Sequence, residues 1–139
     1  MGKVILGLIG EHEDVSKVTK IFVSHGFYRT TIYSKVKEIA KYLLPGNIFP
    51  DETLSEIRDR GYKVSGLYWI NLVLASVPEK KDLIVIDDID EKDVIDGIMS
   101  VYYVGGNKPS DMPSNNFISV NDEMDEKLSK IIKDISRNK

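Results

Sequence analysis

The chain has 139 residues, 42% of them hydrophobic and 29% charged, which suffices for one compact domain and is too short for two ordinary ones. Its net charge of −3 and pI of about 5.4 disfavour nucleic-acid binding, which depends on a basic surface. The absence of cysteine excludes disulfides, thiolate metal sites and cysteine nucleophiles, and it fits a reducing compartment. We therefore expect a single cytoplasmic domain over residues 1–139.

The first apolar run, residues 3–9, predicts a strand in the middle of a parallel sheet. It is almost continuously apolar and β-branched, without the alternation of a half-exposed strand. Gly7 and Gly10 interrupt it and acids follow, so it has neither the length of a transmembrane helix nor a signal-peptide cleavage site. We therefore expect a soluble protein that has no membrane partner.

Downstream, predicted helices and strands alternate along the chain. Asp14 is the predicted N-cap of a helix that ends at Gly26, and Ser34 is the predicted N-cap of a helix that residues 45–46 terminate. Further strands are expected over residues 27–33, 82–88, 99–104 and 117–120, and a loop over 105–116. Further helices are expected from 51 or 53 to 60, stopping at Gly61, over 67–77 and 91–98, and from 121 or 122 onward. This alternation predicts an α/β three-layer sandwich with a mainly parallel central sheet.

An apolar run that ends in glycine just before a helix is typical of a nucleotide-binding strand, loop and helix. Counted from Gly10, a loop of the type Gly-x4-Gly-Lys-Ser/Thr would need glycine, lysine and a hydroxyl where Val15, Ser16 and Lys17 stand. A shift by one residue does not restore the lysine, because the next helical position points about 100° away. A one-residue deletion would restore Ser16 as the magnesium-side hydroxyl, but it would place Val15 at the lysine position.

The charge of this stretch also disfavours a triphosphate. Glu11, Glu13 and Asp14 follow Gly10 directly, and one like-charge contact at 4 Å costs about 4 kcal/mol at an effective dielectric near 20. A helix dipole contributes only about 0.3–1 kcal/mol in the other direction. We therefore expect no ordinary ATP binding here. The same acids also have a structural interpretation, since acids near a helix start stabilise it.

Four segments together resemble viral deoxynucleoside monophosphate kinases and related P-loop nucleotide kinases. They are Ile-Arg-Asp-Arg-Gly-Tyr-Lys at 57–63, Tyr-Trp-Ile-Asn at 68–71, Leu-Ile-Val-Ile-Asp-Asp at 83–88 and Phe-Ile-Ser-Val-Asn-Asp at 117–122. They occur in the order of that family, and the resemblance spans most of the chain. It implies a P-loop kinase-like fold for the predicted sandwich.

The resemblance also implies roles for individual residues. Arg58, Arg60 and Trp69 would hold the nucleoside monophosphate, because an arginine fork grips phosphate and a tryptophan face stacks on a base. Asp87 or Asp88 would be the acid that supports magnesium, with Asp87 the candidate metal ligand. The full candidate nucleotide-binding set is Gly10, Ser16, Lys17, Arg58, Arg60, Lys63 and Trp69.

Several of these residues also have a purely structural interpretation. Trp69 fits the core of an apolar helix, while Arg58, Arg60 and Lys63 fit a solvated helix face. An acid that ends a strand, such as Asp87, can instead cap a following turn.

The departures from the family pattern concern phosphoryl transfer, which relies on cationic positioning of the transferred group. Residues 89–91, Ile-Asp-Glu, stand where such kinases commonly continue with an arginine, and Ser34 stands where an acid often opens a helix. The stretch 105–116 offers only Lys108 as a cation in place of an arginine-rich lid.

Three hypotheses follow. In the favoured one, the chain is a degenerate, non-catalytic kinase relative, viral and located in the host cytoplasm, which binds a nucleotide-like ligand or a protein partner. In the second, it is an active deoxynucleoside monophosphate kinase that uses Mg and ATP, with Asp87 and Asp88 catalytic and Lys17 or another cation replacing the missing lysine. In the third, it is a homodimeric interaction protein without a ligand.

Overall fold

The computed structural model describes residues 3–43, 46, 50–90, 93, 99–106, 117–120 and 124–137. Its strands are β1 (Val4–Gly10), β2 (Tyr28–Thr30), β3 (Leu83–Ile86), β4 (Ser100–Gly105) and β5 (Phe117–Ser119). Its helices are α1 (His12–Ser24), α2 (Ile32–Leu43), α3 (Asp51–Val64), α4 (Tyr68–Ala75) and α5 (Met124–Arg137). The five strands form one sheet in the order β2-β3-β1-β4-β5, and every neighbouring pair is parallel.

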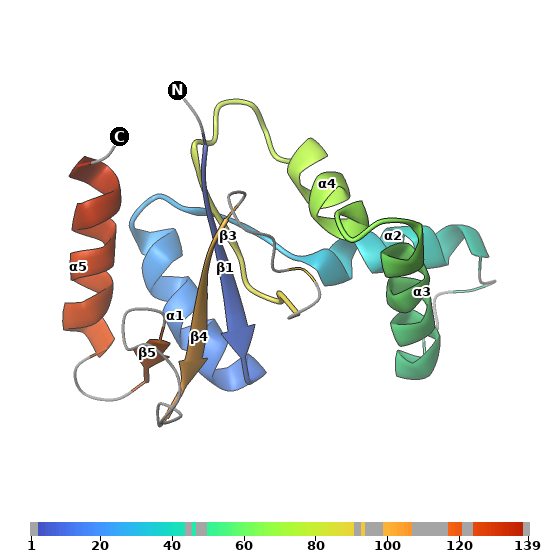
Figure 1. The fold of residues 1–139 in the computed structure, drawn as a ribbon, viewed down its shortest axis with the longest axis horizontal. Helices are drawn as coiled ribbons and strands as arrows, with labels where there is room; N and C mark the ends of the chain where they lie inside the picture. The colour runs from blue at the N-terminus through green and yellow to red at the C-terminus, as the bar shows by residue number, and fades with distance from the viewer. Residues whose placement is uncertain are drawn as a thin grey trace.

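Helices cover both faces of this sheet. Figure 1 shows α1 and α5 on one side, and α2, α3 and α4 grouped on the other. The predicted α/β class with a parallel sheet is therefore confirmed, and the arrangement is that of a three-layer sandwich. The first apolar run is the central strand, as its composition predicts, because β1 lies between β3 and β4.

The central strand divides the hydrophobic core into two clusters. Leu6 and Leu8 pack with α1 and α5, whereas Ile5 and Ile9 pack against the cluster formed with α2, α3 and α4. Successive side chains of a strand point to opposite faces, so a strand covered on both faces must be apolar at nearly every position. This explains why residues 4–9 show no polar alternation.

The C-terminus of α1 confirms the predicted role of Gly26. Its φ of 92° lies in the left-handed region, and its N–H donates to the carbonyl of Val23 at 3.1 Å. The N–H of Phe27 donates to the carbonyl of Phe22 at 3.1 Å, and the two phenyl rings meet edge to face at 5.0 Å. This is a Schellman motif with its hydrophobic contact, and it ends the helix.

Two helices begin earlier than predicted. Helix α1 starts at His12 with Glu11 at the N-cap position, so Asp14 lies in the first turn and is not the cap. Helix α2 starts at Ile32, which shortens the predicted strand 27–33 to Tyr28–Thr30. Thr31 precedes this helix, and its Oγ1 accepts the N–H of Ser34 at 3.1 Å. Thr31 is therefore the capping side chain in place of Ser34.

Helix α3 also differs from its predicted end. It does not stop at Gly61 but continues to Val64. A Cβ at Gly61 would collide with the Nε1 and ring of Trp69, and with the ring of Tyr68. The glycine therefore serves the close packing of α3 on α4.

The predicted helix 91–98 and most of the predicted loop 105–116 lie outside the described residues, apart from Asp93 and residues 105–106. Within the described part of the chain, no helix has the length and apolar character needed to cross a membrane.

Candidate functional site at the carboxyl edge of the sheet

The junction between β1 and α1 is the first part of the candidate site. Strand β1 ends at Gly10 and α1 begins at His12, so only Glu11 separates them. The N–H of Val15 donates to the carbonyl of Glu11 at 2.9 Å, which is the first bond of the helix. A phosphate-binding loop needs several non-helical residues whose amides surround the phosphate. Here the positions that correspond to that loop are already helical.

Gly10 has a packing role at this junction. It is the register partner of Val104 in the pairing of β1 with β4. A Cβ at Gly10 would collide with the carbonyl oxygen of Val104 and lie 3.2 Å from a methyl group of Val15. The absence of a side chain therefore lets β4 and α1 approach the end of β1.

Ser16 and Lys17, the other candidates of the junction, lie in α1. Ser16 is half-buried and Lys17 is exposed. Glu11 and Glu13 are exposed beside them, and no side chain caps the first turn of the helix. The start of α1 thus carries acids where a bound phosphate would need donors.

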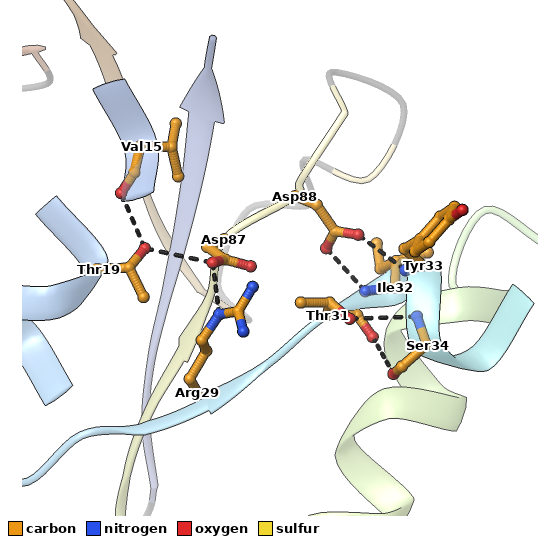
Figure 2. Close-up of polar contacts among 9 residues, drawn as sticks. All are labelled: Val15, Thr19, Arg29, Thr31, Ile32, Tyr33, Ser34, Asp87 and Asp88. Atoms are coloured by element: carbon orange, nitrogen blue, oxygen red, sulfur yellow. Dashed lines mark hydrogen bonds and ion pairs between the residues drawn. The ribbon is translucent and has the colours of Figure 1, made fainter. Parts of the chain in front are cut away.

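Asp87 follows β3 and points toward α1, as Figure 2 shows. Its Oδ2 accepts a hydrogen bond from Nε of Arg29 at 2.7 Å, and the Thr19 hydroxyl lies 3.4 Å from the same oxygen. The Asp87 side chain is 8% exposed, whereas that of Arg29 is 51% exposed. The cation beside this carboxylate is therefore an arginine of the chain itself.

Asp88 points the other way, toward the first turn of α2 (Figure 2). Its Oδ1 accepts the N–H of Ile32 at 2.7 Å and its Oδ2 accepts the N–H of Tyr33 at 2.8 Å. Together with Thr31, it satisfies the first three amides of α2, which have no partner inside the helix. Burial raises the pKa of the Asp88 carboxyl, although the two amide bonds and the positive charge of Arg58 oppose that shift.

Arg58 is committed to contacts within the chain. Its Nη2 donates to the carbonyl of Asp88 and to Oδ2 of Asp93, both at 3.0 Å, and its Nε donates to the Tyr62 hydroxyl at 3.0 Å. Asp93 is fully buried, and its Oδ2 also accepts the N–H of Asp90 at 2.9 Å. These bonds hold the segment after β3 against α3.

The charge of Arg58 is maintained by its neighbours. Burial alone would lower its pKa, but the hydrogen bond to Tyr62 and the carboxylates of Asp88 and Asp93 act more strongly, so the pKa is raised. The guanidinium is therefore a permanent cation, and the chain's own carboxylates neutralise it.

Trp69 is fully buried in the core cluster formed by α2, α3 and α4. Its Nε1 donates to the carbonyl of Arg58 at 2.7 Å, and its ring meets that of Tyr68 edge to face at 4.9 Å. The ring has no exposed face on which a base could stack in this conformation. Trp69 is therefore a residue of the hydrophobic core.

The candidate cations are not brought together. Arg60 and Lys63 are exposed on α3, whereas Lys17 is exposed on α1. Figure 1 places these two helices on opposite sides of the sheet. Lys17 therefore lies apart from Arg60 and Lys63. Among the described residues, no group of three or more His, Asp or Glu side chains could hold a metal ion.

Sequence reasoning missed several residues of this region. Arg29, Thr19 and Thr31 form the contacts around the two acids, and Tyr62 and Asp93 form those around Arg58. Thr31 and Tyr62 carried a local signal, since a threonine three residues before Ser34 fits an N-cap and Tyr62 is four residues after Arg58 on the same helix. Arg29 and Thr19 lie far from Asp87 in the sequence, and Asp93 lies far from Arg58. No spacing rule reveals these contacts.

No protein-family model, curated protein or solved structure significantly matches the chain.

Proposed function

We propose that this chain is a non-catalytic, P-loop kinase-like domain that acts by binding a protein partner and has no site for a donor nucleotide. The viral origin that the resemblance implies and the cytoplasmic location expected from the absence of cysteine belong to the same proposal. The observation that carries it is the single residue, Glu11, between the end of β1 and the start of α1. A connection of this length cannot surround a triphosphate.

The residues expected to hold a monophosphate support the same proposal. Arg58 is neutralised by the buried Asp93, and Trp69 is enclosed in the core. Asp87 and Asp88, the acids expected to support magnesium, are bound by Arg29 and by the first amides of α2. A ligand would have to break these contacts before it could use the side chains, and buried polar groups left unpaired cost about 1–3 kcal/mol each.

The surface favours a protein partner over a nucleotide-like ligand. The exposed cations do not converge, as described above, whereas large apolar side chains gather where α2 and α3 end. Tyr42 is 90% exposed, Leu43 65% and Val64 74%. Exposed apolar side chains of this size, when grouped, are typical of a surface that another protein covers.

A thermal-shift screen tests this function. The full chain is heated with nucleoside mono-, di- and triphosphates, each with and without magnesium. We expect no shift in the melting temperature, since a ligand present at 100 times its Kd would stabilise the fold by about 2.7 kcal/mol. A saturable shift with any nucleotide would overturn the proposal, and a shift that requires magnesium and a triphosphate would favour an active kinase.

A further inference from the structure

A group of backbone carbonyls lies at the opposite end of the sheet from the candidate site, where the chain turns between α4 and β3. The side chain of Lys3, just before β1, reaches this turn. Its Nζ donates to the carbonyl oxygens of Lys81 at 2.8 Å, Pro78 at 3.2 Å and Glu79 at 3.3 Å. Figure 1 shows this connection passing beside the N-terminal end of β1. Three carbonyl oxygens of one short turn therefore converge on one positive charge.

The three oxygens match the bonding capacity of the ammonium group. A lysine ammonium has three N–H donors and no acceptor, so three carbonyl oxygens can satisfy all of its hydrogen bonds. The turn is closed at the same position, because the N–H of Lys81 donates to the carbonyl of Pro78 at 3.0 Å. Beside it, the N–H of Val4 donates to the carbonyl of Asp82 at 2.7 Å, next to the pairing of β1 with β3. The turn is thus held against the start of the central strand partly by the Lys3 ammonium.

The chemistry of the turn indicates which kind of cation it suits. Its side chains contribute two acids, Glu79 and Asp82, and two bases, Lys80 and Lys81, so residues 78–82 carry no net charge. The attraction for a cation therefore comes from the carbonyl dipoles. Rings of backbone carbonyls are the ligands that replace the hydration shell of potassium in channels.

The distances also favour a monovalent cation. The three oxygens lie 2.8–3.3 Å from the charged nitrogen. Oxygen ligands lie about 2.3–2.6 Å from calcium and about 2.0–2.1 Å from magnesium, and sites for both ions usually include carboxylates. Ammonium and potassium are similar in size. The spacing of the oxygens therefore fits a cation of that size better than a divalent ion.

We propose that the backbone of residues 78–81 is a binding site for a monovalent cation of the size of ammonium or potassium, and that Lys3 is its built-in occupant. Without that charge the facing carbonyl dipoles repel one another, which destabilises the closed turn. The ammonium is attached to the chain, so its high effective concentration keeps dissolved cations out of the site. The site goes beyond the proposed function and is independent of it, because it lies at the amino end of the strands.

Removal of the ammonium tests the site. Lys3→Met keeps an unbranched side chain without the charge, and Lys80→Met is the matched control, since it removes the same charge from an exposed side chain of the same turn. Circular dichroism gives the melting temperature of each variant, relative to the parent in the same salt, in choline, lithium, potassium and ammonium chloride at equal ionic strength. In choline chloride, Lys3→Met is expected to melt roughly 4 °C below the parent.

The site predicts which salts restore stability. Potassium and ammonium are expected to recover most of the loss in Lys3→Met, with a saturable dependence on concentration, whereas lithium is not. Lys80→Met is expected to follow the parent in every salt. The proposal would be overturned if Lys3→Met were as stable as the parent in choline chloride, or if Lys80→Met lost as much. Equal recovery in lithium would also overturn it, since that indicates screening without a site, and so would no recovery in potassium or ammonium.

The parent chain supplies a second test that does not depend on the stability of a variant. In nuclear magnetic resonance spectra of the ¹⁵N-labelled parent, the ammonium hydrogens of Lys3 are expected to exchange with water more slowly than those of Lys80, because three carbonyls hold them. Equal exchange of the two groups would contradict the proposal. Neither test involves a nucleotide, so failure here is distinct from failure of the proposed function in the thermal-shift screen.

Discussion

Gly10 and Val104 are register partners where β1 and β4 pair, and the carbonyl oxygen of Val104 occupies the space that a side chain at Gly10 would need. This contact, together with the nearby methyl group of Val15, explains the glycine that ends β1 through packing alone. Helix α1 starts only one residue after Gly10, at the position where a phosphate-binding loop would have to form. The junction is thus built by backbone packing, and Glu11 and Glu13 are exposed while Asp14 is half-buried.

Substitution of Gly10 tests this packing. Gly10→Ala is expected to lower the free energy of unfolding by about 1–3 kcal/mol, because the added Cβ meets a backbone carbonyl that cannot move aside easily. Urea denaturation measures the change. Gly66→Ala is the matched control, since nothing lies within 4 Å of a Cβ at that position. Equal stability of the two variants would contradict the packing role.

The fluorescence of Trp69 gives a direct test of the site, because the chain contains one tryptophan. The ring is fully buried, so we expect blue-shifted emission and slow quenching by acrylamide. Addition of deoxynucleoside monophosphates is expected to leave the spectrum unchanged. Saturable quenching by a monophosphate would instead indicate that a base reaches the indole, as the kinase resemblance implied.

Removal of Arg58 tests whether its charge serves the fold. Arg58→Ala leaves the fully buried Asp93 without its partner, and loss of one member of a buried ion pair costs about 3–5 kcal/mol. We expect a value toward the lower end, because the Arg58 side chain is 22% exposed. Arg60→Ala, on the same helix but exposed, is expected to stay within about 0.5 kcal/mol of the parent. Chemical denaturation measures the loss of stability in both variants. Equal losses would contradict a structural role for the charge of Arg58.

Stability at alkaline pH depends on Tyr62. Burial raises the pKa of its phenol well above the ordinary value of 10.0, so the unfolded chain loses this proton first as the pH rises. The contribution of Tyr62 to stability is therefore complete below pH 10 and decreases above it. Tyr62→Phe cannot ionise and is expected to show a shallower decrease. Denaturation curves on both sides of pH 10 measure the two slopes, and identical slopes would contradict the burial of the phenol.

The elements that could be predicted from the sequence are those that local pattern determines. A continuous apolar run placed β1 in the middle of the sheet, because a strand covered on both faces has no polar side. Gly26 ended α1 as expected, since the left-handed backbone conformation it adopts strongly favours glycine.

The remaining differences have tertiary causes. Gly61 carries the same local signal as Gly26, but α3 continues past it to Val64. The absence of a side chain at Gly61 instead leaves room for the ring of Trp69. The start of α2 depends on Asp88, which lies far along the chain and binds the first amides of that helix. The sequence pattern predicts Asp88 at the end of a strand over residues 82–88, but it could not reveal which groups Asp88 binds.

The central claim, that the β1–α1 junction receives no nucleotide phosphate, is tested most directly by nuclear magnetic resonance. Magnesium-ATP is titrated to millimolar concentration into the ¹⁵N-labelled chain while the amide resonances of residues 10–17 are followed. We predict that these resonances do not move, because the junction has no loop whose amides could surround a phosphate. Saturable shifts confined to these amides would contradict the claim and restore the donor-nucleotide site.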